Sequence, residues 1–267
     1  MALLEKRLRA SAPSRKPRLF VGPSGSGRRF LAKWLWIHQG GPWVELSGLG
    51  PLRLDELMAA ARQASGGTLL VTDLEELDEQ GQRDLLFVLA KYPTLVDPPR
   101  LSATAEPSIA LLVAQGRFSR SLYHQMSVLR HQVPSIQERT EDLPELCRLL
   151  LESHAHTEDR SVPDLLPDGL DALRCYDWPG GVRELSNVLL RAVFLDSAID
   201  ALTVGELLVG ESKREVVAVP IGSTLAEAEK TLILASLSRF GNKACAARSL
   251  GITRRTLYLK LARYGHR

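Results

Sequence analysis

The chain has 267 residues, of which 45% are hydrophobic and 24% are charged, and its formal net charge is +3. A chain of this length and composition has room for one or two globular domains and can bury a sizeable core. It contains no apolar run of about 18 residues, the length that a membrane-spanning helix needs, so we expect no membrane among its partners.

The first 18 residues are basic, with six Lys or Arg and one Glu. No apolar stretch of the kind found in secretory signals follows them. We therefore expect a flexible basic segment over residues 1–18 and a protein that stays in the cytoplasm. We also expect no receiver or ligand-sensing domain ahead of Leu19, which leaves expression level or a protein partner as the means of control.

The three cysteines, Cys147, Cys175 and Cys245, are far apart and odd in number. They show neither C-x-x-C spacing nor a histidine cluster, so the sequence predicts no metal site. Thiols in a reducing cytoplasm usually stay unpaired. We therefore expect three separate buried thiols.

The first 200 residues alternate short apolar runs with helical patterns, as α/β domains do. Residues 19–21 and 68–72 are continuous apolar runs, which are typical of buried parallel strands. Residues 28–38 and 84–89 have the patterns of helices that follow these strands. Together these segments predict an α/β domain.

From Glu141 onward the pattern is helical only, with a Pro-Gly-Gly break at residues 179–181. This pattern predicts a helical lid or small bundle packed on the sheet. Residues 210–222 combine charges, Gly and Pro without helical periodicity, so we expect a linker there. Three helical segments follow, over residues 224–239, 243–250 and 253–264.

Positive charge is concentrated at the C-terminal end. From Ile221 to Arg267, nine Lys or Arg stand against Glu227 and Glu229, which gives +7 and leaves −4 for the rest of the +3 total. A polyanionic partner is therefore expected to bind the C-terminal segment.

The stretch GPSGSGRRF follows the first expected strand and has the spacing of a phosphate-binding loop. In such loops backbone N–H groups cradle phosphates, a Lys reaches the β and γ oxygens, and a Ser or Thr hydroxyl binds Mg²⁺. Gly22, Gly25 and Gly27 keep the backbone part, whereas Arg28 and Arg29 replace the Lys and the hydroxyl residue. Two interpretations stay open: the arginines bind ATP or ADP phosphates without Mg²⁺, or they pair with carboxylates or solvent beside a simple turn.

The C-terminal segment has the pattern of a helix-turn-helix. Small and apolar side chains form the expected core: Ala244, Ala246, Ala247, Leu250, Ile252, Leu257 and Leu261. Gly251 supplies the tight turn, and Thr253 can cap the last helix. On that last helix Arg254, Arg255, Tyr258 and Lys260 are expected to face outward. The full set expected to contact DNA is Lys243, Thr253, Arg254, Arg255, Thr256, Tyr258 and Lys260. A basic helix of this kind fits a major groove, and the alternative is a solvated helix that closes a bundle.

The same segment resembles the helix-turn-helix domain of the Fis family. The family pattern is N-K-x-x-A-A-x-x-L-G-I-[ST]-R-x-T-L-Y-x-K-L-x-x-Y-G, and nearly every position from Asn242 to Gly265 matches it. The resemblance implies binding to double-stranded DNA as a homodimer formed through residues 224–239. It also implies two recognition helices about 34 Å apart on a partly palindromic site.

Four earlier stretches resemble, in order, the AAA+ domain of sigma-54-dependent transcriptional activators, also called bacterial enhancer-binding proteins. They are GGTLLVTDLEELDEQGQRDLLFVL (66–89), LVAQGRFSRSLYHQM (112–126), VPSIQERTEDLPEL (133–146) and YDWPGGVRELSNVLLRAVFL (176–195). The resemblance implies an α/β AAA+ P-loop domain with a helical lid subdomain, followed by an all-α Fis-type helix-turn-helix domain. The expected boundaries are 1–18 for the basic segment, 19–138 for the α/β subdomain, 139–209 for the lid, 210–222 for the linker and 223–267 for the helix-turn-helix.

The departures from this family fall on residues that hydrolyse ATP. A strand that ends in Asp-Glu in the family, for Mg²⁺ and for water activation, ends here in Thr72 and Asp73. Asp73 is expected either to orient water or simply to end the strand. Ser119 and Gln125 stand at the two arginine-finger positions, and Glu106 stands at the sensor asparagine. The loss of a finger in related machines lowers the rate by about 10³ or more.

One position in the lid, Arg183, keeps the sensor arginine of the family. The residues expected to contact a nucleotide, weakly, are therefore Gly22, Gly25, Gly27, Arg28, Arg29, Asp73 and Arg183. The family also inserts a GAFTGA loop, which grips the sigma factor, before the GGTLLV strand. Here about 25 residues, PWVELSGLGPLRLDELMAAARQAS, fill that space, so this loop is expected to be absent.

These features favour a sequence-specific DNA-binding transcriptional regulator associated with a bacterial nucleoid. Its AAA+ domain is expected to be hydrolysis-deficient and to serve oligomerisation or partner contact, without remodelling sigma-54 polymerase. No catalytic residue or metal is expected, and ATP or ADP without Mg²⁺ is the candidate cofactor. Candidate partners beyond DNA and a second copy are a higher oligomer, a mixed ring with an active family member, and RNA polymerase. The alternative is a slow but genuine ATPase, or a nucleotide-sensing regulator of transcription.

Overall fold

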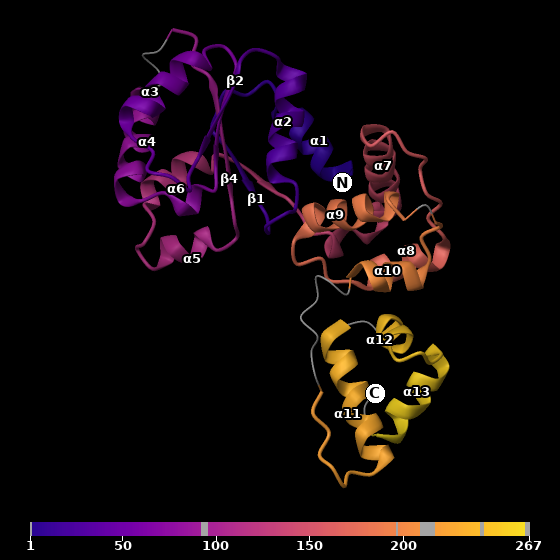
Figure 1. Cartoon of the computed structure of the whole chain (residues 1–267). Coiled ribbons are helices and arrows are strands. Elements are labelled where there is room, and N and C mark those ends of the chain that lie inside the picture. The colour runs from indigo at the N-terminus through magenta and orange to yellow at the C-terminus, as the bar shows by residue number, and fades with distance from the viewer. Residues whose placement is uncertain (1, 92–95, 196, 209–216, 241–242, 265–267) are drawn as a thin grey trace. The chain divides into compact units, whose positions relative to one another are not determined.

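The structure is a computed structural model that describes residues 2–91, 96–195, 197–208, 217–240 and 243–264. The chain forms two compact units (Figure 1). One is Met1–Asp142 together with Pro179–Glu184, and the other is Leu143–Trp178 together with Leu185–Arg267.

The first unit contains a five-stranded parallel sheet with the strand order β2-β3-β4-β1-β5. Its strands are β1 Arg18–Val21, β2 Trp43–Ser47, β3 Thr68–Thr72, β4 Arg100–Ala105 and β5 Leu129–Gln132. The two strands predicted from continuous apolar runs are confirmed as β1 and β3, and every residue of both is buried. Such runs are needed because neither face of a covered parallel sheet meets water.

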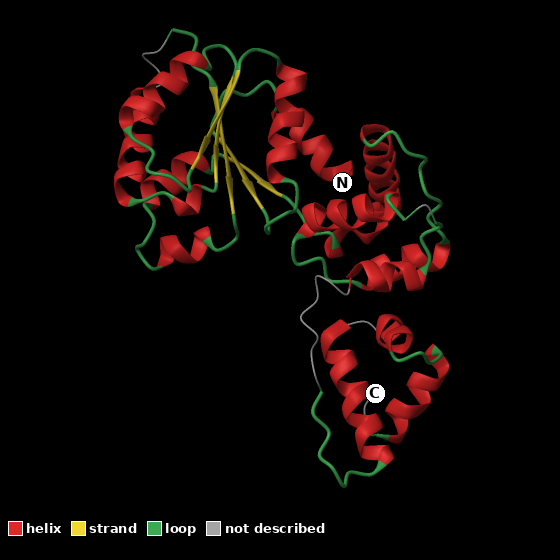
Figure 2. Cartoon of the chain, in the orientation of Figure 1, coloured by secondary structure: helices red, strands yellow, loops and turns green. Residues whose placement is uncertain are grey.

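Helices cover both faces of this sheet (Figure 2). On one face lie α3 Leu54–Gln63, α4 Glu79–Lys91, α5 Ile109–Ala114 and α6 Arg120–Met126, with a short 3₁₀ turn η1 Leu74–Glu76; on the other lie α1 Ala2–Ser11 and α2 Arg28–Gln39. Strand side chains alternate between the faces. Leu19 and Val21 therefore join the core with α3 and α4, whereas Phe20 joins the core with α1 and α2.

The prediction of a flexible basic start is wrong for residues 2–11, because they form the helix α1. Leu4 and Leu8, four positions apart, are buried in one core with Phe20 and α2. The guanidinium of Arg18 is fully buried and donates to three carbonyls at the end of this helix, those of Ser11, Ala12 and Ser14. Lys6, Arg7 and Arg9 lie on the exposed face of this amphipathic helix, opposite Leu4 and Leu8.

The predicted lid is present as four helices of the described chain: α7 Leu143–Thr157, α8 Pro167–Cys175, α9 Gly181–Val193 and α10 Ala201–Leu208. A 3₁₀ segment η3 Gln137–Asp142 precedes them, and the first turn of α9 belongs to the first unit. Trp178 is buried, and its indole N–H donates to the carbonyl oxygen of Leu173 at 2.8 Å. This bond ties the loop after α8 to the helix before it.

The predicted C-terminal helices are confirmed as α11 Leu225–Phe240, α12 Lys243–Ser249 and α13 Arg254–Arg263. They share one core, made by Ile233, Ala246, Ala247, Leu257 and Leu261. Gly251 has φ +65°, the left-handed backbone that the turn between α12 and α13 needs. The expected linker lies partly outside the described residues, and its described part, residues 217–222, contains no helix or strand.

Two of the cysteines are joined, which corrects the prediction of three separate thiols. Cys175 at the end of α8 and Cys245 in α12 form a disulfide, with their Cα atoms 5.2 Å apart. Cys147 is a buried free thiol, and burial raises its pKa to about 12. The pairing gave no signal in the sequence because the partners are 70 residues apart and only the fold brings their Cβ atoms together.

In the part of the chain that the structure describes, no helix has both the length and the apolar content needed to span a lipid bilayer.

Candidate nucleotide and nucleic-acid sites

The glycine-rich loop lies between β1 and α2, as in a phosphate-binding loop. Gly25 and Gly27 have φ +70° and +98°, and the helix α2 begins directly after Gly27. Left-handed backbone of this kind is open to glycine at little cost and strained for other residues. The backbone shape of the loop predicted from Gly22, Gly25 and Gly27 is thus present.

A second backbone segment packs on this loop. The N–H of Val182 donates to the carbonyl oxygen of Gly25 at 2.8 Å. A Cβ atom on Gly25 would overlap the carbonyl oxygen of Gly180, so the two backbones touch with no room for a side chain. The loop is therefore held by protein contacts from residues 179–184.

Arg28, at the position of the usual lysine, is enclosed by carboxylates. Its Nη2 lies 3.8 Å from Asp73 Oδ1 and 3.7 Å from Glu106 Oε1, and its Nη1 lies 3.9 Å from Glu75 Oε1. Only 10% of the Arg28 side chain is exposed. The guanidinium is therefore surrounded by negative charge that the protein itself supplies.

Glu75 is the most buried of these carboxylates, with 5% of its side chain exposed. Burial raises its pKa, although its Oε1 accepts the backbone N–H of Glu106 at 3.0 Å. Among the described residues, Ser26 Oγ, Arg28 Nη1 and Glu75 Oε2 are buried without a hydrogen-bond partner. The surroundings of Arg28 are thus polar, and its own side chain is almost fully buried.

Arg29, at the position of the usual hydroxyl residue, points to a different partner. Its Nε lies 2.7 Å from Glu45 Oε1 on β2, while 70% of its side chain stays exposed. Both arginines of the loop therefore have carboxylate partners. This outcome agrees with the interpretation of pairing with carboxylates, which the sequence left open beside phosphate binding.

The end of β3 carries no metal ligand of the family type. Thr72 is buried, and its hydroxyl lies 3.5 Å from the carbonyl oxygen of Leu46. Asp73 has φ +51°, and its N–H donates to the Thr104 hydroxyl at 3.1 Å. Its carboxylate faces Arg28, so Asp73 ends the strand and pairs with a cation.

At the two positions where the family has arginine fingers, Ser119 is hydrogen-bonded and Gln125 is exposed. Ser119 caps α6, where its hydroxyl accepts the N–H of Leu122 at 3.3 Å, and its own N–H donates to Gln82 Oε1 at 2.8 Å. Gln125 is exposed on the same helix. Arg183, the retained sensor residue, is exposed in the first turn of α9.

These contacts do not fit ATP bound with Mg²⁺. Carboxylates occupy the surroundings of Arg28, where a phosphate of the same sign would have to lie, and like charges at such distances repel. Arg29 and Thr72 cannot replace the metal-binding hydroxyl and carboxylate. The segment between α2 and β3 is taken up by β2 and α3, in the place where the family inserts its GAFTGA loop.

The recognition helix expected from the sequence is α13, and Thr253 caps it as predicted. The Thr253 hydroxyl accepts the N–H of Thr256 at 3.1 Å. Arg254 and Arg255 are exposed in the first turn, and 53% of Tyr258 is exposed beside them. Lys243 extends from α12, with its Nζ 5.0 Å from the centre of the Tyr258 ring. Lys243 and Tyr258 thus lie together, and Arg254 and Arg255 are exposed on the same helix as Tyr258.

Lys260 departs from the prediction that it faces outward. Its ammonium pairs with the Glu229 carboxylate on α11, and only 27% of its side chain is exposed. The same carboxylate accepts the Tyr264 hydroxyl at 3.2 Å, and these contacts lower the pKa of Glu229. Lys260 therefore links α13 to α11 through this ion pair.

Sequence reasoning missed the acids that engage these basic residues. Glu45, Glu75 and Glu229 lie 16 or more positions from their partners, so no local spacing marks them. Glu106 did carry a signal, because an acid stands there in place of the neutral sensor residue. An acid at that position and an arginine in the loop can neutralise each other's charge.

Three family models match the chain. One described as sigma-54 interaction domain matches residues 1–136, one described as AAA+ ATPase lid domain matches residues 137–213, and one described as bacterial regulatory protein, Fis family, matches residues 224–264. The order of these matches agrees with the fold class expected from the sequence, an α/β AAA+ domain, a lid and a helix-turn-helix.

Similar proteins include the transcriptional regulatory protein ZraR of Klebsiella oxytoca, which is 33% identical over 267 residues and covers 95% of this chain. The nitrogen assimilation regulatory protein NtrX of Azorhizobium caulinodans is 28% identical over 294 residues, again with 95% of this chain covered. The chain spans 58% of the length of that ZraR and 64% of that NtrX.

Among solved structures, NtrX from Brucella abortus in complex with ADP has a TM-score of 0.76 at 23% identity, covering 99% of this chain and 68% of that one. The RuvB Holliday junction branch migration motor of Thermotoga maritima has a TM-score of 0.57 at 15% identity, covering 99% and 86%. At these identities the likeness shows a shared fold.

Proposed function

The chain belongs to the sigma-54 interaction domain family, and from that premise we propose that it is a DNA-binding regulator of transcription whose AAA+ domain does not hydrolyse ATP. The enclosure of Arg28 by Asp73, Glu75 and Glu106 is the observation that carries the loss of hydrolysis. The exposed basic start of α13 in a Fis-type domain supports the binding of DNA.

The α13 helix offers the chemistry that reads double-stranded DNA. Arg254 and Arg255 lie at its N-terminal end, the part of a recognition helix that reaches base edges in the major groove. Arginine can bond guanine through two N–H groups, and Tyr258 and Lys243 can contact phosphate. Such a surface binds DNA with a strong dependence on salt.

A homodimer through residues 224–239 would place two α13 helices on one site. Leu225 and Leu232 on α11 are 90% and 47% exposed, and they lie two turns apart on one side of the helix. Exposed leucines at this spacing support pairing with a second copy. In that dimer the two recognition helices lie about 34 Å apart, one turn of the duplex.

The AAA+ domain serves this regulator as a scaffold. Metal, nucleophile-activating and finger positions are all altered, and each acts on the same barrier, so their losses combine. The short connection through β2 and α3 removes the means of gripping the sigma factor, so the chain does not remodel sigma-54 polymerase. Its AAA+ domain instead contacts other copies in a higher oligomer, an active family member in a mixed ring, or RNA polymerase. The regulator acts in the cytoplasm of a bacterium, on the nucleoid.

A second candidate function is nucleotide binding without hydrolysis. It is favoured by the retained left-handed glycines and by Ser26 Oγ and Arg28 Nη1, two buried atoms of the loop that have no hydrogen-bond partner. ATP or ADP would bind without Mg²⁺ after Arg28 exchanges a carboxylate for a phosphate. The two candidates therefore differ in what Arg28 prefers as a partner.

One assay separates the candidates. Purified chain is mixed with labelled ATP in EDTA or in Mg²⁺, and both retained nucleotide and released phosphate are measured. Neither retention nor release is the result expected from the proposal. Retention in EDTA without release supports the second candidate, and steady release that Asp73→Ala abolishes overturns both.

A matched variant tests whether the acids around Arg28 prevent the binding of ATP. Glu106→Asn restores the neutral side chain of the family and removes one partner of Arg28, so ATP retention is expected to rise relative to the unaltered chain. Glu79→Gln, an exposed acid on α4, serves as the control and should leave retention unchanged.

The DNA-binding half has its own test. Duplexes selected from a random library are titrated with the chain at several salt concentrations. We expect binding that weakens steeply as salt rises, since each phosphate contact releases counterions. Absent or salt-insensitive binding would return α13 to the alternative of a solvated helix that closes a bundle.

A further inference from the structure

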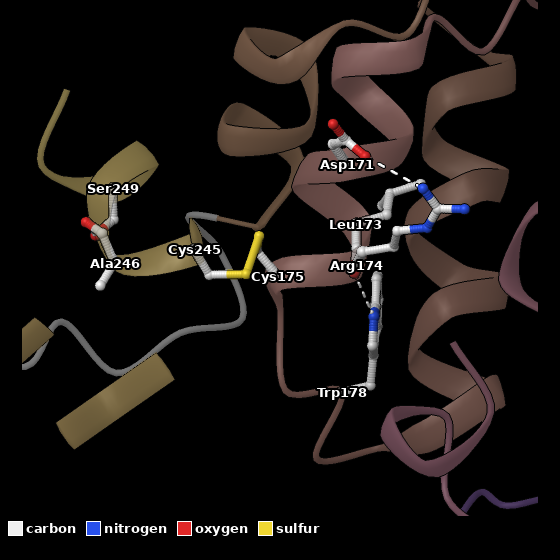
Figure 3. The surroundings of a disulfide bond; sticks show 8 residues. All are labelled: Asp171, Leu173, Arg174, Cys175, Trp178, Cys245, Ala246 and Ser249. Carbon is white, nitrogen blue, oxygen red and sulfur yellow. Dashed lines mark hydrogen bonds and ion pairs between the residues drawn. A yellow bond between two sulfur atoms is a disulfide. The ribbon is translucent and has the colours of Figure 1, made fainter. Parts of the chain in front are cut away.

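The disulfide joins two parts of the chain that different family models match. Cys175 is the last residue of α8 in the lid, and Cys245 lies in α12 of the helix-turn-helix (Figure 3). On the lid side its surroundings include Leu173 and Trp178, and on the other side Ala246, which belongs to the core of the helix-turn-helix. The bond therefore ties one folded core to another.

This covalent bond is much shorter than the connection along the chain. Sixteen residues separate the end of α10 from the start of α11. A segment of that length can span at most about 55 Å when extended. The disulfide holds the Cα atoms of its two cysteines 5.2 Å apart. Its presence or absence thus decides how far α12 can move from α8.

The three cysteines differ in their access to reagents. Cys175 is half-buried, and Cys245 is 8% exposed. Cys147 is fully buried, and burial raises its pKa to about 12, so it supplies almost no thiolate at neutral pH. Exchange can therefore begin at Cys175, while Cys147 does not compete for either partner.

We propose that Cys175 and Cys245 are a redox-active pair that locks the helix-turn-helix to the lid when oxidised and releases it when reduced. Formation needs a hydroperoxide: the Cys175 thiolate attacks one peroxide oxygen, giving a sulfenic acid and releasing water or an alcohol. The Cys245 thiolate then attacks that sulfur and expels hydroxide, which takes up a proton and leaves as water, as the S–S bond forms. Release needs a dithiol, whose thiolate attacks Cys175 and expels the Cys245 thiolate. Its second thiol then resolves the mixed disulfide, so two electrons and two protons pass to the pair.

The lock acts on DNA binding through geometry, and this step rests on the proposed function. Arg254 and Arg255 are exposed in the disulfide form, so the bond does not cover the recognition surface. In a dimer on DNA, however, the two α13 helices must lie about 34 Å apart. When each α13 helix is fixed to its own lid, the dimer can adopt only those arrangements of its two helix-turn-helix domains that also leave room for both AAA+ domains. Apparent affinity falls in proportion to the fraction of arrangements that can bind.

The experiment compares the whole chain after treatment with hydrogen peroxide and after treatment with dithiothreitol. We expect an intramolecular crosslink in the first sample, seen as faster migration in a non-reducing gel, and none in the second. On a duplex of about 40 base pairs, the oxidised chain should bind at least about tenfold more weakly than the reduced chain. The absence of a crosslink, or equal affinity of the two forms, overturns the inference.

Three variants identify the pair. Cys175→Ser and, separately, Cys245→Ser should bind DNA with the affinity of the reduced chain under both treatments. Cys147→Ala should still respond to peroxide. A peroxide response that survives both serine variants overturns the assignment to this pair.

A second measurement does not depend on DNA. The rotational correlation time of α12 and α13, obtained by nitrogen-15 relaxation, should shorten on reduction because the helix-turn-helix then tumbles separately from the lid. Failure of both forms to bind DNA would overturn the proposed function while this measurement still judges the lock. An unchanged correlation time overturns the lock itself.

Discussion

The loop after β1 and the start of α13 both present a pair of adjacent arginines, but their surroundings differ. Arg28 is nearly buried and faces three carboxylates, and Arg29 pairs with Glu45. Arg254 and Arg255 are exposed in the first turn of α13, where the described residues show no carboxylate bonded to them. The same side chain is thus neutralised internally in one region and available to an outside anion in the other.

A basic motif must be judged by the acids that fold against it. A count of positive residues gives equal weight to both pairs, although only one pair can attract a polyanion. Arg28 is expected to matter for stability, and Arg255 is expected to matter for binding. Substitutions can separate these two roles.

The largest effect is expected from Arg28→Ala. Removal of this cation leaves the Glu75 carboxylate buried without its counter-charge, which costs about 3 kcal/mol in the free energy of unfolding. Denaturant titration measures this change. Arg254→Ala is the matched control and should alter stability by less than about 0.5 kcal/mol. Equal effects of the two substitutions would erase the contrast between the regions.

A pH titration extends the comparison to another buried basic group. Burial, with Arg18 and Arg7 nearby, lowers the pKa of His131 from 6.5 to about 4. As pH falls from about 6.5 toward 4, the unfolded chain binds a proton at His131 and the folded chain does not. The free energy of unfolding that His131 contributes is therefore complete above about pH 6.5 and is lost as pH falls toward 4. The loss attributable to His131 reaches about 3 kcal/mol.

Denaturant midpoints measured between pH 4 and pH 7.5 test this expectation. His131→Gln should remove most of this part of the pH dependence, whereas His124→Gln, at an exposed position on α6, should leave it in place. An identical slope for both variants would show that burial does not control the titration of His131.

Arg255→Ala is expected to weaken DNA binding by about 1–3 kcal/mol, roughly 5- to 150-fold, if the guanidinium bonds a base edge. Titration of a selected duplex gives the affinity, and folding stability should hardly change. Arg62→Ala, at an exposed arginine on α3, is the control and should bind like the unaltered chain. A similar loss in both variants would mean that charge alone governs binding.

The smallest effect is expected from Lys260→Ala. Because this ammonium is already paired with Glu229, its removal should change DNA affinity by no more than about twofold. The same duplex titration measures it. Lys243 has no such carboxylate partner among the described residues, so Lys243→Ala should lower the DNA affinity more. A loss as large as that of Arg255→Ala would restore Lys260 to the DNA-binding set.

Much of the fold could be predicted because periodic patterns are local. The strands β1 and β3, the lid and the three C-terminal helices all follow from the spacing of apolar residues and glycines. The helix α1 was missed because its two buried leucines stand among basic residues. The disulfide and the acids around Arg28 depend on contacts between distant positions, which spacing does not encode.

The candidate sites divide in the same way. The cap at Thr253 and the exposure of Arg254 and Arg255 follow from short-range spacing within one helix. The departures at Thr72 and Glu106 could be read from the family pattern. What Arg28 touches could not, because Glu75 reaches it only after β3 and α2 have assembled.

The contact between Gly25 and Gly180 gives a loop glycine a structural role that does not depend on a nucleotide. Since the backbone of residues 179–184 packs against the loop, a side chain at Gly25 would be rejected whether or not a nucleotide binds. Packing alone can thus require these glycines, whether or not the loop hydrolyses ATP. In related chains, the residue after the last loop glycine and the acids that face it should therefore report lost hydrolysis better than the glycines do.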